Sequence, residues 1–120
     1  MTGQVTQLHA LVSIPFRVPG QPDVVIEFVV DTGFAGFLTL PPAAVSALNL
    51  PVVRAIPANL ADDSSILVFV HAATIDWNGE ERDVEVMALG RRPLLGTLLL
   101  DGHDLEIQFA DGGLVTIDRL

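Results

Sequence analysis

The sequence contains no cysteine, which excludes a disulfide framework and any chemistry that depends on a thiolate. Basic residues are also scarce, with six Lys and Arg against 15 Asp and Glu and a net charge of −9 at pH 7. This balance disfavours partners with a phosphate backbone or an anionic lipid surface. Residues 1–8 lack the basic and then apolar pattern of a signal peptide. We therefore expect a cytoplasmic protein that binds neither nucleic acid nor membrane.

Long hydrophobic runs are missing too, although half of the 120 residues are hydrophobic. No apolar segment approaches the length that crosses a bilayer. We expect the apolar excess in a buried core and in an interface between subunits. The chain has no linker, repeat or low-complexity segment and is long enough for a modest core of its own. A single domain over residues 1–120 is predicted.

Hydrophobic periodicity predicts a mostly β fold. Short apolar segments between turn residues are expected as strands over residues 8–18, 24–30, 37–40, 52–60, 66–75, 82–89, 105–109 and 114–117. Pro41-Pro42 predicts a short helix over residues 43–48, because proline is tolerated in a first helical turn. A second helical turn is expected at residues 97–100. Asn78-Gly79 is typical of a two-residue hairpin turn.

The most informative stretch is the apolar strand at residues 24–30, which leads directly into Asp31-Thr32-Gly33. Gly33 and Gly36 permit the positive φ or the close backbone approach that a tight turn needs. Taken alone, the tripeptide is explained most simply as a hairpin turn. A second stretch changes this interpretation, since Leu94-Leu95-Gly96 ends a later strand and opens an apolar helical turn.

Together these stretches resemble the retropepsin-like aspartic proteases of clan AA, in particular their small bacterial single-domain members. The matching residues are Asp31-Thr32-Gly33 after an apolar strand, Leu94-Leu95-Gly96 before a short helix, and the closing strands between Asp104 and Ile117. The patterns Asp-Thr-Gly-Phe-x-Gly and Leu-x-Leu-Pro also recur in those proteins, and looser similarity covers nearly the whole chain. The resemblance implies the acid-protease fold, a closed β-barrel with one or two short helices and one lobe per chain.

The resemblance also implies the reaction. Such enzymes hydrolyse peptide bonds with a water molecule activated by two carboxylates that share one proton. One aspartate accepts a proton from the water, while the other hydrogen-bonds to the carbonyl oxygen or protonates it. Because Asp-Thr-Gly occurs once here, the two carboxylates must be the Asp31 side chains of a homodimer, on either side of its two-fold axis. A peptide or protein substrate is implied, with neither a cofactor nor a metal.

Three groups of site residues are implied by the same resemblance. In the catalytic group, Asp31 supplies the carboxylate, Thr32 hydrogen-bonds across the two-fold axis and Gly33 allows close backbone approach. The substrate-binding positions are Phe34, Leu60, Ile66, Arg92 and Leu94. The flap that covers the substrate is expected at Ala61, Asp62, Asp63, Ser64 and Ser65.

Two departures from the retroviral members leave a second function open. Those enzymes carry an acidic residue and an arginine that pair with each other, at positions that are Ala35 and Thr97 here. Both partners are missing together, so no charge is left buried and unpaired. No glycine occurs between Gly36 and Gly79, whereas retroviral flap tips are rich in glycine. The alternative is a catalytically silent dimerisation or peptide-binding module that keeps the fold and Asp31.

The remaining candidates have simple interpretations. Arg92 either reaches the cleft, where it would favour an acidic or polar substrate group, or it points to solvent. Asp101-Gly102-His103-Asp104 lacks the ligand spacing of a metal site and is expected to be a solvated loop. His9 and His71 fall in apolar strands and are expected to be packed or at a sheet edge.

Overall fold

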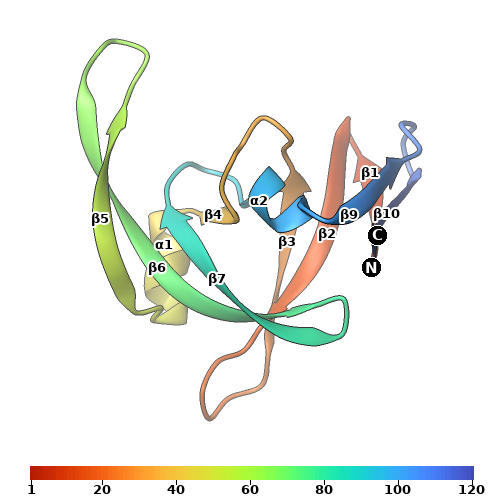
Figure 1. Cartoon of the computed structure of the whole chain (residues 1–120), viewed down its shortest axis with the longest axis horizontal. Coiled ribbons are helices and arrows are strands. Elements are labelled where there is room, and N and C mark those ends of the chain that lie inside the picture. Colours follow the sequence, from red (N-terminus) through yellow and green to blue (C-terminus); the bar gives the residue numbers. More distant parts are fainter.

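The computed structural model describes residues 1–120 as ten β-strands and two short helices (Figure 1). The strands are β1 (Thr2–Thr6), β2 (His9–Phe16), β3 (Val24–Val30), β4 (Leu38–Leu40), β5 (Val52–Asn59), β6 (Ser65–Trp77), β7 (Glu80–Ala88), β8 (Leu94–Leu95), β9 (His103–Ile107) and β10 (Leu114–Arg119). The helices are α1 (Pro42–Leu48) and α2 (Thr97–Leu100). The predicted mostly β architecture is confirmed, and both helices occur where the sequence predicts them.

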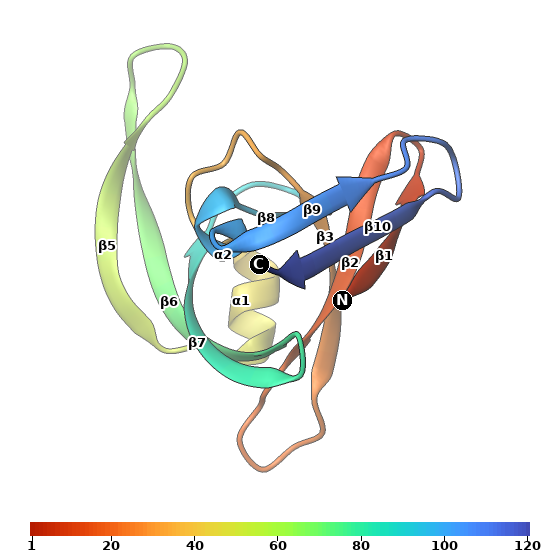
Figure 2. The same cartoon turned by 45° about the vertical axis from the view of Figure 1, so that its right-hand side comes forward.

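All the strands belong to one sheet, in the order β5-β6-β7-β4-β8-β3-β2-β1-β10-β9. β6 also pairs with β2, where Ile75 lies opposite Phe16. The sheet therefore curls on itself, and β2, β3, β8, β4, β7 and β6 follow one another around a ring. Most neighbours are antiparallel, but β3–β8 and β4–β7 are parallel. Figure 2 shows the curled sheet with β9 and β10 lying across its near side.

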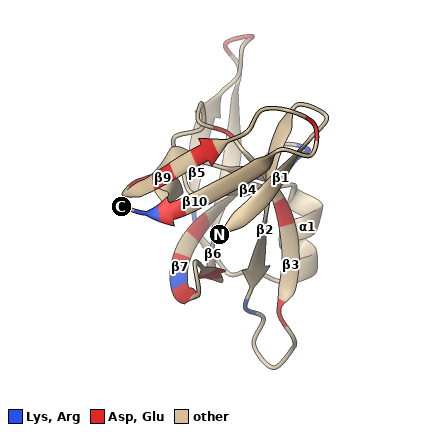
Figure 3. Ribbon diagram, turned by 90° about the vertical axis from the view of Figure 1, so that its right-hand side faces the viewer, with Lys and Arg blue, Asp and Glu red and all other residues tan.

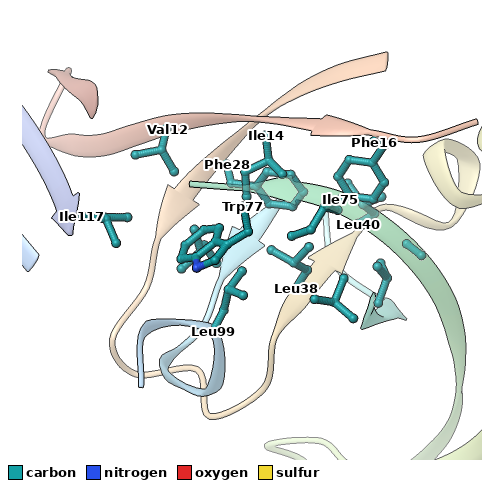
Figure 4. Close-up of a cluster of buried hydrophobic side chains, with 14 of the residues drawn as sticks. Val12, Ile14, Phe16, Phe28, Leu38, Leu40, Ile75, Trp77, Leu99 and Ile117 are labelled. Atoms are coloured by element: carbon teal, nitrogen blue, oxygen red, sulfur yellow. The ribbon is translucent and has the colours of Figure 1, made fainter. Parts of the chain in front are cut away.

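The hydrophobic core lies inside this curled sheet (Figure 4). Alternate residues of β2 point inward, so that Ala10, Val12, Ile14 and Phe16 are all buried. Phe16 stacks on Phe28 of β3, with the ring centroids 5.9 Å apart. Complete burial of one large apolar side chain contributes about 1.5–3 kcal/mol. The strand that leads to Asp31 is thus anchored by its own inward-facing residues.

The first strand, β1, was not predicted. Its sequence is polar, and Val5 is its only fully buried residue. The segment is extended because it lies between two partners and pairs antiparallel with both β2 and β10. A strand that is specified by its neighbours leaves little trace in its own hydrophobic pattern.

The strand near the C-terminus is also displaced from its predicted position. β9 spans His103–Ile107 instead of residues 105–109, because its pairing with β10 continues until His103 lies opposite Arg119. The predicted solvated loop at residues 101–104 is therefore partly strand. His103 Nε2 accepts a hydrogen bond from Trp77 Nε1 at 3.0 Å, so this histidine has a structural partner.

The helix α1 has the ends that its sequence predicts. Pro42 occupies the first turn, and Asn49 ends the helix in the left-handed conformation with φ of 53°. Neither this helix nor any other in the structure is both long and apolar enough to span a membrane.

Candidate active site at the end of β3

Asp31 directly follows β3. At this point the Asp-Thr-Gly turn meets the Leu-Leu-Gly segment, which lies far from it in the sequence. β3 and β4 are consecutive in the chain, yet β8 is inserted between them and pairs with both. The Asp31 N–H donates a hydrogen bond to Leu95 O at 2.9 Å. The Asp-Thr-Gly turn is therefore bound through its backbone to the Leu-Leu-Gly segment.

The turn itself holds the Asp31 carboxylate. Oδ1 accepts a hydrogen bond from the Gly33 N–H at 2.9 Å, and the Asp31 carbonyl accepts one from the Phe34 N–H at 3.1 Å. Asp31 is half-buried, whereas Thr32 and Gly33 are exposed. The Thr32 hydroxyl makes no hydrogen bond within the chain, so it is free to bond to another molecule. All three predicted catalytic residues thus lie at one exposed turn.

Two glycines let the turn and α2 pack closely. A Cβ at Gly96 would lie 2.2 Å from Gly36 O and 2.6 Å from Phe34 Cδ2, and a Cβ at Gly36 would lie 2.5 Å from Phe34 Cζ. The Phe34 ring therefore covers both glycines. Phe34 O also accepts hydrogen bonds from the Thr97 N–H at 2.8 Å and the Thr97 hydroxyl at 3.3 Å. Phe34 supports the turn from within, and its predicted contact with substrate remains a prediction.

The electrostatic surroundings of Asp31 are unusual for so acidic a protein. Asp31 is the only charged residue between Glu27 and Arg54, and residues 93–100 carry no charge. The other acidic residues are spread over several strands and turns, including Glu27 on β3 (Figure 3). No basic side chain forms an ion pair with Asp31, although Arg17, Arg54 and Arg119 all have acidic partners. The half-buried Asp31 carboxylate therefore has no cationic partner within the chain.

The predicted flap is the hairpin of β5 and β6, with residues 60–64 at its tip. The tip closes without glycine because Asp63 adopts the left-handed conformation, with φ of 65°, which aspartate tolerates better than most residues. Asp62 Oδ1 accepts hydrogen bonds from the Ser64 hydroxyl and the Ser64 N–H. These bonds hold the pKa of Asp62 below its ordinary value. The glycine-free tip is therefore a regular, hydrogen-bonded turn.

In Figures 1 and 2 the tip of the flap hairpin and the loop between β3 and β4 project to the same side of the molecule and are separated from each other. Two of the predicted substrate-binding residues, Leu60 and Ile66, lie on the flap hairpin and are 42% and 37% exposed. Neither residue forms a backbone hydrogen bond with the Asp31 turn, and their contact with substrate remains a prediction.

The other predicted binding positions lie beside the Asp31 turn. Leu94 is half-buried in β8, opposite Val29 of β3 and Thr39 of β4. Arg92 is exposed and forms no ion pair, but its carbonyl accepts a hydrogen bond from the Thr39 hydroxyl at 3.4 Å. Sequence reasoning missed Thr39, which is 2% exposed. The available signal was a single hydroxyl within the apolar run Leu38-Thr39-Leu40.

A cavity of the chain lies away from this turn. It has a volume of about 650 Å³ between the end of α1, the β2–β3 connection and β6, and Asp31 does not line it. Several of its polar groups are bonded to one another, as in the hydrogen bond from the Thr74 hydroxyl to Asp83 and the ion pair of Arg17 with Asp23. No three acidic, histidine or cysteine side chains lie together as metal ligands. The candidate site is therefore the open turn at Asp31.

Comparison with known proteins adds no family assignment. No protein-family model matches the chain, and no curated protein is significantly similar to it in sequence.

Proposed function

We propose that this chain is an aspartic endopeptidase of the retropepsin-like fold that acts as a homodimer. The observation that carries the proposal is the Asp31 carboxylate, which is half-exposed, fixed by the Gly33 N–H and free of any cationic partner. The curled sheet, with β8 between β3 and β4, is compatible with a closed β-barrel of the acid-protease type.

In the proposed reaction, water attacks the peptide carbonyl between two Asp31 side chains. The ionised carboxylate accepts a proton from the water, and the protonated one donates its proton toward the carbonyl oxygen. No cation forms an ion pair with Asp31. Two carboxylates held about 3 Å apart in such a site repel by roughly 5 kcal/mol at an effective dielectric constant of about 20. They would therefore retain one shared proton, as the mechanism requires.

The dimer is a requirement of this chemistry. The chain has one Asp-Thr-Gly, and Asp31 has no second carboxylate among its hydrogen-bond partners. A second copy would supply the missing acid and would also cover the exposed turn. The free Thr32 hydroxyl and the exposed Gly33 backbone lie at the same turn, where a symmetric partner would meet them.

A second candidate function is a dimerisation or peptide-binding module without catalysis. The observation that favours it is the flap hairpin, which extends from the molecule with exposed apolar residues, among them Leu67 at 62% and Phe69 at 47%. An apolar hairpin of this kind can bind peptide without cleaving it. The two candidate functions differ in whether Asp31 acts on a bound peptide.

The deciding experiment combines oligomeric state with cleavage. Sedimentation at tens of micromolar should show a dimer, and a diverse peptide library should be cleaved by the wild type but not by Asp31→Asn. Asparagine is nearly isosteric and preserves the fold, yet it cannot accept the proton from water. Chelators and thiol reagents should have no effect. A protein that is only monomeric, or an Asp31→Asn variant that cleaves at the wild-type rate, contradicts the proposal; a dimer that binds peptides intact supports the module.

A further inference from the structure

Thr39 has the most buried polar side chain of the molecule. It is 2% exposed in β4, and the other buried polar residue is His71 at 9%. The Thr39 hydroxyl accepts a hydrogen bond from the Leu94 N–H at 3.1 Å and donates one to Arg92 O at 3.4 Å. One hydroxyl thus satisfies a backbone donor and a backbone acceptor on the two sides of Pro93, a residue that has no N–H of its own.

The segment that Thr39 holds is the one that receives the end of β3. The Val29 N–H donates to Pro93 O, and the Asp31 N–H donates to Leu95 O, each at 2.9 Å. These two carbonyl groups alternate along the chain with the two groups that Thr39 binds. The hydroxyl is therefore linked to the Asp31 backbone through a single short strand.

The loop before β8 does little to fix this strand. β8 has two residues, Leu94 and Leu95, and residues 90–92 before it are exposed. A two-residue strand has few backbone hydrogen bonds of its own. The buried hydroxyl opposite Leu94 therefore adds two hydrogen bonds to those that the backbone of residues 93–95 makes with β3 and Asp31.

We propose that Thr39 is a positioning residue for Asp31: its hydroxyl sets the register of residues 92–95 and so the location of the Asp31 carboxylate. The inference rests on the proposed function, because a position matters for catalysis only if Asp31 is catalytic. In a symmetric dimer, any displacement of Asp31 occurs on both sides of the axis. A displacement on the order of 1 Å can cost about 100-fold in rate.

The test compares Thr39→Val, which keeps the β-branched shape and removes the hydroxyl, with Thr39→Ser, which keeps the hydroxyl. The first readout is amide hydrogen exchange at Asp31 and Val29, measured against the Val5 amide, which bonds to Gly113 O elsewhere in the sheet. In Thr39→Val we expect exchange at Asp31 and Val29 to accelerate by about 10-fold relative to Val5. Thr39→Ser should stay within about 2-fold of the wild type.

The second readout is the division between kcat and KM for a cleaved peptide. Thr39→Val should lower kcat by about 10-fold and leave KM within about 2-fold, while Thr39→Ser restores kcat. The matched control is Thr74→Val, which removes a half-buried hydroxyl bonded to Asp83 and should change neither readout. Should Thr39→Val fail to fold, Thr39→Cys serves instead, since a thiol is a weaker donor and acceptor.

The outcomes separate this inference from the proposed function. If the wild type cleaves no peptide, the proposed function fails, and exchange at Asp31 still decides whether Thr39 positions it. Equal acceleration at Asp31, Val29 and Val5 would mean that Thr39 supports only global stability. That result, or an unchanged kcat in a folded Thr39→Val dimer, overturns the inference.

Discussion

At the scale of single residues, the candidate site depends on neutral groups placed around one carboxylate. The Gly33 N–H fixes Asp31, and Gly36 and Gly96 allow Phe34 to pack beneath the turn. None of these groups neutralises the carboxylate. A site of this kind fixes the place of the carboxylate through backbone groups and close packing alone.

Gly96→Ala should destabilise the protein by about 1–3 kcal/mol, because a Cβ there would lie 2.2 Å from Gly36 O and backbone would have to move. Denaturant unfolding measures the loss. The matched control is Gly20→Ala, where φ is 73° but nothing lies within 4 Å of an added Cβ. The stability of that variant should fall only by the cost of placing alanine in the left-handed conformation, about 1–2 kcal/mol, and the Asp31 site should be unchanged. Equal losses, with unchanged amide exchange at Asp31 in both variants, would show that the close contact at Gly96 does not matter.

Arg92→Leu tests whether this exposed, unpaired guanidinium contributes to substrate selection. If Arg92 reaches the cleft, the variant should cleave fewer peptides that carry an acidic or polar group in one subsite, at unchanged thermal stability. A solvent-facing charge contributes only about 0–1 kcal/mol, so its loss would leave the cleavage profile unaltered. Comparison of the peptide-library cleavage profiles of the wild type and the variant shows whether the Arg92 side chain reaches the cleft or faces solvent.

At the scale of elements, an ion pair joins the flap hairpin to the neighbouring strand β7 of the curled sheet. Arg54 of β5 reaches past β6 to Glu85 of β7 and makes two hydrogen bonds, one of them 2.7 Å long. The hydrogen bond from Arg54 is the main reason that the pKa of Glu85 lies below its ordinary value. This contact lies near the base of the hairpin, where it limits how far β5 moves from the sheet.

Arg54→Gln should loosen the flap hairpin without unfolding the domain. We expect faster amide exchange along β5 and little change in β2 at neutral pH. Because the folded-state pKa of Glu85 lies below its unfolded value, the contribution of the pair is complete above the unfolded pKa and is lost as pH falls through the folded pKa. The difference between variant and wild type should therefore disappear in acid.

The control for the Arg54–Glu85 ion pair is Arg119→Gln. It removes a comparable exposed ion pair, Arg119 with Glu80 at 2.9 Å, at the opposite end of the chain. Its effect should stay in β10 and leave β5 unchanged. If both substitutions accelerate amide exchange in β5 equally, the Arg54–Glu85 ion pair has no specific role in holding β5.

At the scale of the whole molecule, catalysis in a dimer should be fastest on the acidic side of neutral. The two Asp31 side chains must hold one proton between them, and coupled carboxyl groups titrate as a pair. The measurement is kcat/KM for one peptide from about pH 3 to pH 9, with sedimentation at each pH to follow the dimer. A rate that continues to rise between pH 7 and pH 9 contradicts a shared-proton mechanism.

Most elements could be predicted from the sequence because each carries a local signal. Pro42 and Asn49 bound α1, Asn78-Gly79 forms the predicted hairpin turn, and the apolar residues of β2 alternate. β1 and the full extent of β9 could not be predicted in this way. Their extended conformation comes from pairing with strands distant in the sequence, chiefly β10.

The sequence by itself determined the mostly β character, the two helices and the exposed turn that carries Asp31, since propensity, periodicity and turn chemistry act between near neighbours. Only the tertiary structure decided that β8 lies between β3 and β4, that Phe34 covers two glycines and that Thr39 is bonded to the segment around Pro93. It also decided that the tip of the flap hairpin and the loop between β3 and β4 project to the same side of the molecule (Figure 1). Contacts of this kind join residues far apart in the chain, and one hydroxyl or one missing Cβ acquires a role only when the partner that it meets is known.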